Sequence, residues 1–427
     1  MIDREKAPNY NDISEFKLLE PVKETLNNGI DLFVFNSGEQ DLVRIEWVFD
    51  NLSVAGANPL YNVALSAMLL EGTKKLSGAE IAEKIDFYGA FLQPEYSFDH
   101  TSLTLYVLNR YVGELLPMLK DILTNSIIPS KELDTYIRNN KQSLAVSLNK
   151  TDFIARRTFN KSIFGDTKYG FSPTLSDYDN LERELLLTLL KQQISSDNCT
   201  IFIAGKVESK TIDTISAFFG GTWGAAEPNI RVKDAYIFNT FSSDITLVEK
   251  TTALQSAIRI GNLAINRTDP DFSVFQLVNT ILGGYFGSRL MNNIREDKGY
   301  TYGIGSGIGA LKHGAFFTIA TEVGVEVTAA TLEEIEKEIN RLKSEKVPLE
   351  ELNLVKNYIA GTFLGSLENV FSHVDKFKNI YFNGLDMNFY TRHLAIIKNS
   401  DTEDILMTAN KYLHYDRMAK IVVGKIS

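Results

Sequence analysis

Cysteine and histidine are both scarce in this 427-residue chain, which has one cysteine and five histidines. The single cysteine, Cys199, can form neither an intrachain disulfide nor a cysteine-based zinc site, and its apolar neighbours favour a small core residue. No two histidines lie within five residues of each other, so no pair is spaced to hold a metal on adjacent helix turns. The histidines are His100, His313, His373, His393 and His414.

Long apolar runs and an excess of basic residues are also absent. No segment approaches the ~18 apolar residues of a membrane-spanning helix, and residues 1–16 have no apolar core of the kind found in a signal peptide. Asp and Glu number 54 against 44 Lys and Arg, a net charge of −10, which argues against nucleic acid as a partner. We therefore expect a cytoplasmic protein without a membrane span.

The chain repeats itself at a period of about half its length. Gly205 and Gly424 each end an apolar strand that follows an amphipathic helix, and they lie 219 residues apart. A predicted helix over 79–88 ends at Gly89, and one over 288–298 ends at Gly299, an offset of 210 residues. A glycine adopts the left-handed conformation just past a helix cheaply, which explains both helix ends.

The order of predicted elements within each repeat favours an α+β fold. Strands are expected over 43–49, 102–108, 257–261 and 316–323, and helices over 111–124 and 328–343. Strands and helices mix without strict alternation, so we expect two tandem homologous domains, each a largely antiparallel sheet with helices packed on one face. The expected limits are 1–225 for the first domain, 226–241 for a linker and 242–427 for the second domain.

The segment VALSAMLLEGT, residues 63–73, resembles the metal-binding helix of the pitrilysin and insulinase family of inverted-zincin peptidases, to which mitochondrial processing peptidase is related. The resemblance implies the LuxS/mitochondrial processing peptidase-like metallohydrolase fold. In that family two histidines and a glutamate stand where this chain has Val63, Ser66 and Ala67, none of which can bind zinc or act as a base.

The resemblance also implies a third zinc ligand, a glutamate in a long helix farther along the chain. No glutamate occurs from 133 to 181, and the equivalent position is Gln142 or Ser143. We therefore expect no cofactor in this chain and zinc in a partner subunit. Plain packing of a helix against a sheet explains Val63, Ser66 and Ala67 without a functional role.

The second half resembles the family's second-domain motif over residues 283–302, a glycine-rich turn followed by Ser-Arg-Leu, Arg-Glu and a tyrosine. By that resemblance Arg295 and Tyr302 contact the substrate carbonyl and the oxyanion formed from it, with Tyr302 on a strand after the helix. The alternative is that Arg295 pairs with Glu296 or Asp297 on the surface and Tyr302 is an ordinary strand aromatic. Tyr300, expected on the same strand face, is the competing tyrosine.

Substrate binding is also expected at the glycine-rich turn, where Gly283, Gly284, Gly287 and Ser288 allow a peptide backbone to approach; the alternative is an ordinary loop that enters a helix. Active relatives bind peptide along a first-domain edge strand. In this chain that strand contains Pro94, which lacks an N–H, so the first-domain edge is a doubtful substrate site.

Two hypotheses for function follow. The first is a non-catalytic subunit of a heterodimeric zinc endopeptidase, inactive alone, whose homologous partner carries the His-x-x-Glu-His helix and whose substrate is an unfolded peptide. The second is a non-enzymatic peptide-binding or scaffold protein that pairs with itself and shares the fold. An active peptidase of another mechanism is disfavoured, because no Ser, Cys or Thr stands in a recognisable nucleophile setting.

Overall fold

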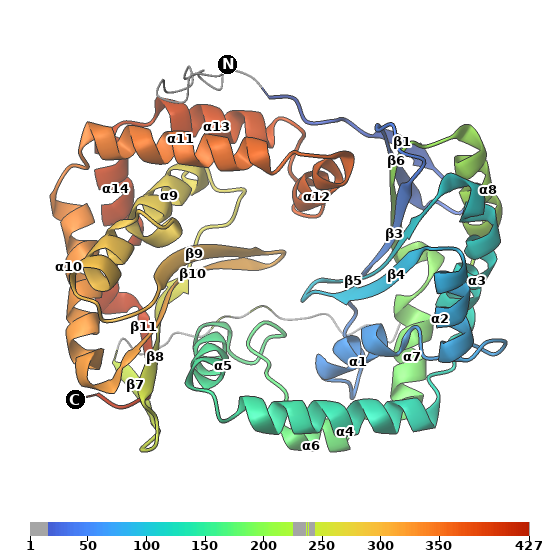
Figure 1. Cartoon of the computed structure of the whole chain (residues 1–427), viewed down its shortest axis with the longest axis horizontal. Coiled ribbons are helices and arrows are strands. Elements are labelled where there is room, and N and C mark those ends of the chain that lie inside the picture. The colour runs from blue at the N-terminus through green and yellow to red at the C-terminus, as the bar shows by residue number, and fades with distance from the viewer. Residues whose placement is uncertain (1–15, 225–235, 237, 239–243, 427) are drawn as a thin grey trace, which may run out of the picture.

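The computed structural model describes residues 16–224, 236, 238 and 244–426. It has two halves, each built on one sheet, and the sheets lie on opposite sides of the molecule (Figure 1). The hairpins β9–β10 and β4–β5 point toward each other between them (Figure 1).

The first half contains six strands and eight α-helices in the described residues. The strands are β1 (Val22–Thr25), β2 (Asp31–Asn36), β3 (Val43–Asp50), β4 (Phe91–Tyr96), β5 (His100–Val107) and β6 (Cys199–Gly205). The helices are α1 (Leu60–Met68), α2 (Gly78–Phe87), α3 (Val112–Asn125), α4 (Ser130–Ser147), α5 (Thr151–Phe164), α6 (Leu175–Asp179), α7 (Arg183–Gln193) and α8 (Ser209–Phe219).

The second half contains five strands and six α-helices in the described residues. The strands are β7 (Ile245–Glu249), β8 (Gln255–Leu263), β9 (Ile304–Leu311), β10 (Gly314–Gly324) and β11 (Ala419–Gly424). The helices are α9 (Phe272–Asn279), α10 (Thr328–Ser344), α11 (Leu349–Gly365), α12 (Val370–Tyr381), α13 (Phe389–Asn399) and α14 (Thr402–Tyr412). The π-helical segment Thr280–Gly284 contains the first two glycines of the glycine-rich turn, and a second π-helical segment, Met291–Asp297, follows the turn.

Five strands of the first sheet, all but the edge strand β1, match the five strands of the second sheet in order, which confirms the predicted duplication. The first sheet runs β1-β2-β6-β3-β5-β4 and the second runs β7-β11-β8-β10-β9. In each sheet one pair is parallel, β2 with β6 and β7 with β11, and the other pairs are antiparallel. The glycines that end the predicted helices, Gly89 and Gly299, have φ of +58° and +68°, so the left-handed helix ends are confirmed.

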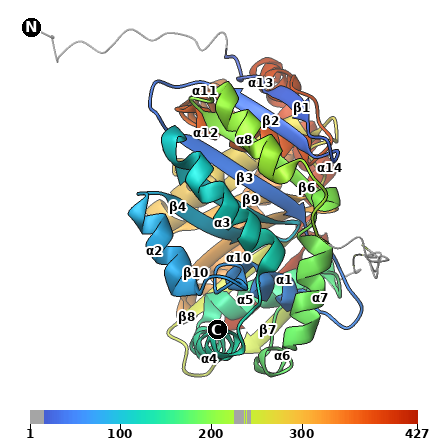
Figure 2. The same cartoon turned by 90° about the vertical axis from the view of Figure 1, so that its right-hand side faces the viewer.

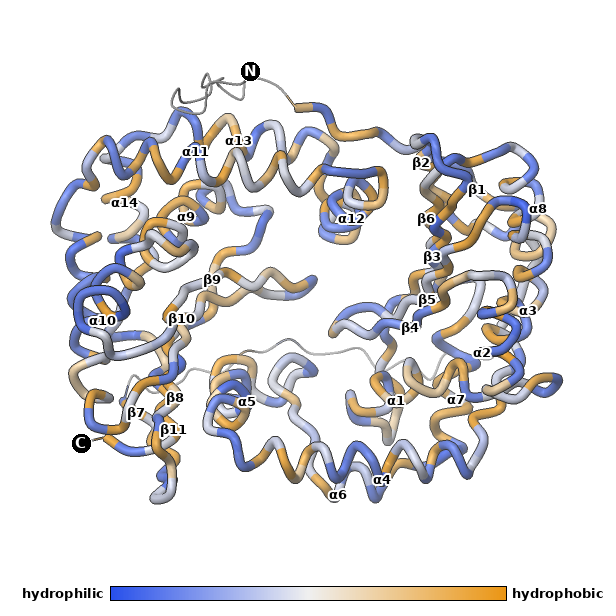
Figure 3. Tube along the Cα trace, viewed as in Figure 1, coloured by the Kyte–Doolittle hydropathy of each residue, from blue (hydrophilic) through white to orange (hydrophobic). Residues whose placement is uncertain are grey.

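Each sheet buries one face under helices of its own half. In the first half α2, α3, α7 and α8 cover the outer face (Figure 2), where fully buried residues such as Trp47 and Ile203 form the larger core. Hydrophobic residues concentrate along β3 and β6, whereas α10 on the outside of the second half is mostly hydrophilic (Figure 3). This arrangement is the predicted layer of helices on a largely antiparallel sheet.

The other face of each sheet is covered by a helix from the opposite half. On β2, Leu32 and Val34 belong to the outer core, whereas Phe33 and Phe35 point to the inner face and pack against Phe377 of α12. In the second half, α5 packs on β8 and β11 through residues that include Phe159. Because α5 and α12 hold corresponding places in the two element orders, the halves exchange equivalent helices.

Ion pairs fix both exchanged helices. On α12, Asp375 contacts Arg44 at 2.8 Å and Lys378 contacts Glu46 at 2.7 Å, and the side chains of Arg44 and Glu46 are almost fully buried on β3. On α5, Asp152 pairs with Arg259 of β8. Each pair connects one half to the other, so the two halves are interlocked.

The expected linker, 226–241, lies outside the described residues apart from 236 and 238, and the expected domain limits stay a prediction. In the described part of the chain, no helix is both long enough and apolar enough to cross a bilayer.

Candidate functional site

Helix α1 stands where the resemblance places a metal-binding helix. Ser66 is buried, Val63 is half-buried against the core and Ala67 is exposed. Helix α4 lies against α1 and carries Gln142 and Ser143, both exposed. None of these side chains is a zinc ligand, so the residues at this position do not fit the metal. Among the described residues no group of three or more His, Cys, Asp or Glu side chains is placed to hold a metal ion.

Arg295 lies near the end of the π-helical segment Met291–Asp297, on the surface of the second half. Its guanidinium lies 4.8 Å from the ring centroid of Phe286 and its Nη1 lies 2.6 Å from Oε1 of Glu296. Phe286 is 67% exposed, and about a third of the Arg295 side chain reaches solvent. The pairing with Glu296 is the alternative that the sequence left open, and it coexists with the cation–π contact.

Tyr302 is 94% exposed and lies in the loop before β9, so its predicted place on the strand was wrong. The loop stays outside the sheet because Gly299 turns the chain back and the N–H of Tyr300 donates to the carbonyl of Ile294 at 3.0 Å. Thr301 then fixes the loop to β10, its hydroxyl donating to the carbonyl of Glu322 at 2.7 Å. An anchored backbone thus presents an exposed phenol.

Tyr300 differs from Tyr302 in its surroundings. Its ring is half-buried against the core of the second half, so the two tyrosines do not share a strand face as predicted. The exposure of the two rings therefore favours Tyr302 over Tyr300 as the residue available to a ligand.

The glycine-rich turn is shaped by close packing. A Cβ on Gly283 would lie 2.6 Å from the backbone nitrogen and the hydroxyl of Ser306 on β9, so only glycine fits there. A Cβ on Gly287 would lie 2.8 Å from the Tyr285 ring, whereas Gly284 is exposed. Ser288 is 1% exposed. Close packing thus explains why residue 283 is a glycine. A role of the turn in substrate binding stays a prediction.

Arg289, within the Ser-Arg-Leu motif, was missed by the sequence analysis. Its Nε and Nη2 donate to the two carboxylate oxygens of Glu351 on α11, each at 2.9 Å, and the arginine is 8% exposed. This bidentate pair fixes the glycine-rich turn against α11. The motif itself was visible in the sequence, but Glu351 lies 62 residues away and no local pattern connects the two.

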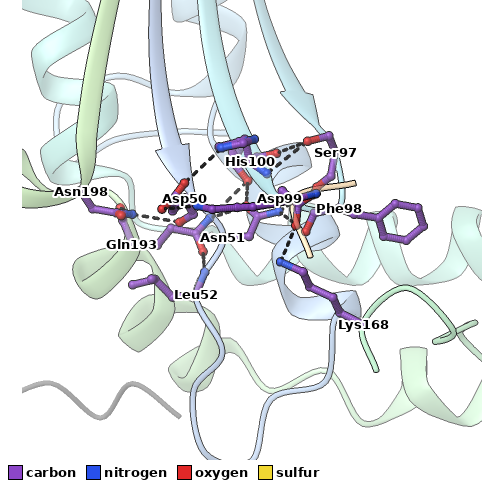
Figure 4. Close-up of polar contacts among 12 residues, drawn as sticks. Asp50, Asn51, Leu52, Ser97, Phe98, Asp99, His100, Lys168, Gln193 and Asn198 are labelled. Atoms are coloured by element: carbon purple, nitrogen blue, oxygen red, sulfur yellow. Dashed lines mark hydrogen bonds and ion pairs between the residues drawn. The ribbon is translucent and has the colours of Figure 1, made fainter. Parts of the chain in front are cut away.

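A second polar cluster, also missed, lies at the tips of the facing hairpins and joins the halves through Lys312. Figure 4 shows its first-half members, among them Asp50, Asp99 and His100. The backbone N–H of Lys312 donates to Asp99 at 3.1 Å, and its Nζ lies 3.0 Å from Asp50. Asp50 also lies 3.1 Å from Nε2 of His100, and Asp99 lies 2.9 Å from Nζ of Lys168. A pocket of 370 Å³ opens beside these residues. Each carboxylate has a cationic partner, so the cluster connects the halves.

Charge balance sets the protonation of this cluster. Burial alone would raise the pKa of Asp50, but hydrogen bonds from His100 and Lys312 outweigh it and hold that pKa well below its usual range. The pKa of Asp99 is also lowered, because Lys168 and Tyr169 outweigh its burial. Both carboxylates are therefore charged at neutral pH.

The edge strands of the two sheets differ in their side chains. As predicted, β4 is an edge strand and contains Pro94, and its Phe91 is 55% exposed. Edge strand β9 has glycine at 305, 307 and 309. The first edge thus lacks a donor at Pro94, whereas the second carries little side-chain bulk.

Comparison with known proteins agrees with this geometry. Residues 64–170 match the family model described as insulinase (peptidase family M16), and residues 180–359 match the model described as peptidase M16 inactive domain. An uncharacterized zinc protease of Rickettsia felis is 25% identical over 90% of this chain and 93% of its own length. A protein of Helicobacter pylori described as the non-peptidase homolog YmxG is 24% identical over 83% of this chain and 82% of its own length.

A solved structure described as a peptidase M16 inactive domain from Pseudomonas fluorescens has the same fold. It superposes with a TM-score of 0.84 and covers 96% of this chain and 99% of its own, at 20% identity. The two family models together match most of the chain, and the duplicated fold agrees with them. The chain therefore belongs to the insulinase family of peptidases, family M16, and lacks the zinc ligands at the position of the family's metal helix.

Proposed function

We propose that this chain is the non-catalytic subunit of a heterodimeric zinc endopeptidase. The homologous partner would carry the His-x-x-Glu-His helix and the zinc, and this chain would supply Arg295 and Tyr302. The observation that carries the proposal is the 94% exposure of Tyr302 on an anchored loop, in a chain whose own α1 has no metal ligand. The expected cytoplasmic location stays a prediction.

The chemistry asked of the two residues is hydrogen bonding to developing negative charge. When a peptide carbonyl is attacked, its oxygen becomes an oxyanion, and a phenol O–H and a guanidinium N–H are suitable donors to it. Phe286 holds the guanidinium from one side by a cation–π contact, which limits its motion without consuming its donors. The hydrogen bond from Thr301 to the carbonyl of Glu322 holds the backbone beside Tyr302.

The test is Tyr302→Phe in the assembled complex of this chain with its partner. We expect peptidase kcat to fall about a hundredfold, because loss of one oxyanion donor costs on the order of 3 kcal/mol. Tyr300→Phe is the matched control, since it removes a phenol from the same loop and should leave kcat unchanged. Full activity of Tyr302→Phe at normal zinc content would reject the proposal, and a loss confined to Tyr300→Phe would assign the role to the other tyrosine.

The partner itself is the first object to identify. A native pull-down from the host, analysed by mass spectrometry, should recover a homologous chain with the His-x-x-Glu-His motif in a one-to-one ratio. Recovery of this chain alone, as a self-paired dimer, would favour the alternative of a peptide-binding or scaffold protein. In that case the Arg295–Glu296 pair would be an ordinary surface ion pair.

A further inference from the structure

A pocket of 590 Å³ is lined by residues of α4, α5 and the second sheet. Helices α4 and α5 run along the base of the molecule in Figure 1. Its walls come from both halves: α4 and α5 of the first half, Phe98 in the β4–β5 turn, and Arg259 and Phe316 on β8 and β10. The volume lies within the range of sites that bind small organic ligands. One lining residue, Ser143, is a position at which a zinc ligand was expected from the resemblance.

The charge of the pocket is positive although the chain as a whole is acidic. Arg156, Arg157 and Arg259 line it, and no Asp or Glu is among its described lining residues. Arg259 pairs with Asp152, whereas neither Arg156 nor Arg157 forms a salt bridge within the described residues. Arg157 donates to the carbonyl of Ser172 at 3.4 Å and feels the charge of Asp177 without contacting it. In a chain of net charge −10, this local positive charge favours an anion over a metal cation.

An aromatic ring positions two of the guanidinium groups, and the third has an N–H without a hydrogen-bond partner in the described residues. Phe153 lies beneath two of them, with ring-centroid distances of 5.7 Å to Arg156 and 5.4 Å to Arg157. The Nε of Arg259 is buried and has no hydrogen-bond partner among the described residues. Burial is the main cause that lowers the pKa of Arg157, a cost that a bound anion would offset.

The remaining walls are largely aromatic, and they decide which anion fits. The rings of Phe98, Phe159, Phe171, Phe316 and Tyr178 line the pocket together with Leu144. Inorganic phosphate would use the arginines and leave these rings without a partner. A carboxylate joined to an apolar side chain would use both, because guanidinium binds carboxylate through two parallel hydrogen bonds while rings pack against the side chain.

We propose that this pocket binds the C-terminal carboxylate of a peptide that ends in an apolar or aromatic residue. The guanidinium groups of Arg156 and Arg157 would bind the carboxylate, and the aromatic walls would receive the terminal side chain. The site belongs to this chain alone and requires neither the partner subunit nor zinc. An experiment can therefore reject this binding proposal without rejecting the proposed peptidase role, and the reverse.

The experiment is calorimetric titration of the isolated full chain with N-acetyl-Ala-Phe and with N-acetyl-Ala-Phe amide. The two probes differ only in the carboxylate, and we expect the free acid to bind at least tenfold more tightly. The double variant Arg156→Gln/Arg157→Gln should lose that preference while binding of the amide stays unchanged. Arg138→Gln, an exposed arginine on α4 outside the pocket, is the matched control and should bind like the original chain.

Three results would overturn the proposal: equal affinity for acid and amide, no binding of either probe, or binding of N-acetyl-Ala-Ala or inorganic phosphate as tight as that of the phenylalanine acid. Circular dichroism and thermal melting would show whether the double variant folds. If it does not, Arg157→Lys replaces it, since this change keeps the charge and removes the planar pair of donors. That variant should bind the acid more weakly, and unchanged binding would also overturn the proposal.

Discussion

The two halves of the chain share a core of five equivalent strands and equivalent covering helices, and yet they differ where a metal or a ligand would be bound. In the first half α1 presents Val63 and Ala67, and the neighbouring edge strand contains Pro94. In the second half the segment around Gly299, which corresponds to the end of α2 at Gly89, displays Tyr302 and Arg295 beside an edge strand with three glycines. The shared fold depends on buried positions, and the differences lie mainly at positions that contact solvent, so one half can lose a site without losing its structure.

The halves also depend on each other, which limits how far each could diverge. Each sheet's inner face is covered by a helix of the other half, α12 on the first sheet and α5 on the second. A change that loosened one exchanged helix would expose an aromatic face of the opposite sheet. We therefore expect the two halves to unfold together.

The largest expected effect tests this mutual dependence. Phe159→Ala on α5 and Phe377→Ala on α12 should each lower the free energy of unfolding by about 3–5 kcal/mol, because each ring fills a buried space against the opposite sheet. Urea unfolding followed by tryptophan fluorescence and circular dichroism measures this. Phe87→Ala is the control, since Phe87 is 80% exposed and its loss should change little. Separate transitions for the two halves in either variant would contradict a mutually dependent core.

The sequence predicted the duplicated fold well, because hydrophobic periodicity and terminal glycines are local signals. The predicted strand over 43–49 is β3, Val43–Asp50, and the predicted helix over 328–343 is α10, Thr328–Ser344. The exchange of α5 and α12 could not be predicted, since Phe159 and Phe377 are buried in either arrangement and no local pattern states which sheet each helix covers.

Around the candidate site, prediction was weaker for a related reason. The spacing of Arg295 and Tyr302 was visible in the sequence. The π-helical segment and the hydrogen bond from Thr301 to Glu322, however, place Tyr302 in a loop instead of a strand. The Arg289–Glu351 pair and the Lys312 contacts with the first half join residues far apart in the chain. Such contacts follow from the complete fold and leave no periodic signal in the sequence.

The second-largest expected effect is on stability and concerns the glycine-rich turn of the second half. Gly283→Ala should lower the free energy of unfolding by roughly 1–3 kcal/mol, since the new Cβ would overlap the backbone of Ser306. Gly113→Ala in α3 is the matched control, because it has open space and a helical position, and it should be neutral or stabilise by up to about 1 kcal/mol. Thermal unfolding of both variants measures the difference. A Gly283→Ala variant as stable as the original chain would show that β9 shifts easily and that close packing does not require this glycine.

The smallest expected effect concerns the joint between the halves and depends on pH. Because the pKa of folded Asp50 is held below its unfolded value, its ion pair stabilises the fold above about pH 4 and this stabilisation is lost as the pH falls further. Lys312→Met removes the pair, and we expect a loss of roughly 1 kcal/mol at pH 7, a modest value because nearly half of the Asp50 side chain is exposed. The difference between variant and original should shrink when urea unfolding is repeated at successively lower pH below 4. Lys337→Met, which breaks an exposed pair with Glu334 within α10, is the control and should cost less at pH 7. A Lys312 effect that is independent of pH would mean that its aliphatic stem or its backbone contact with Asp99, and not its charge, joins the two hairpins.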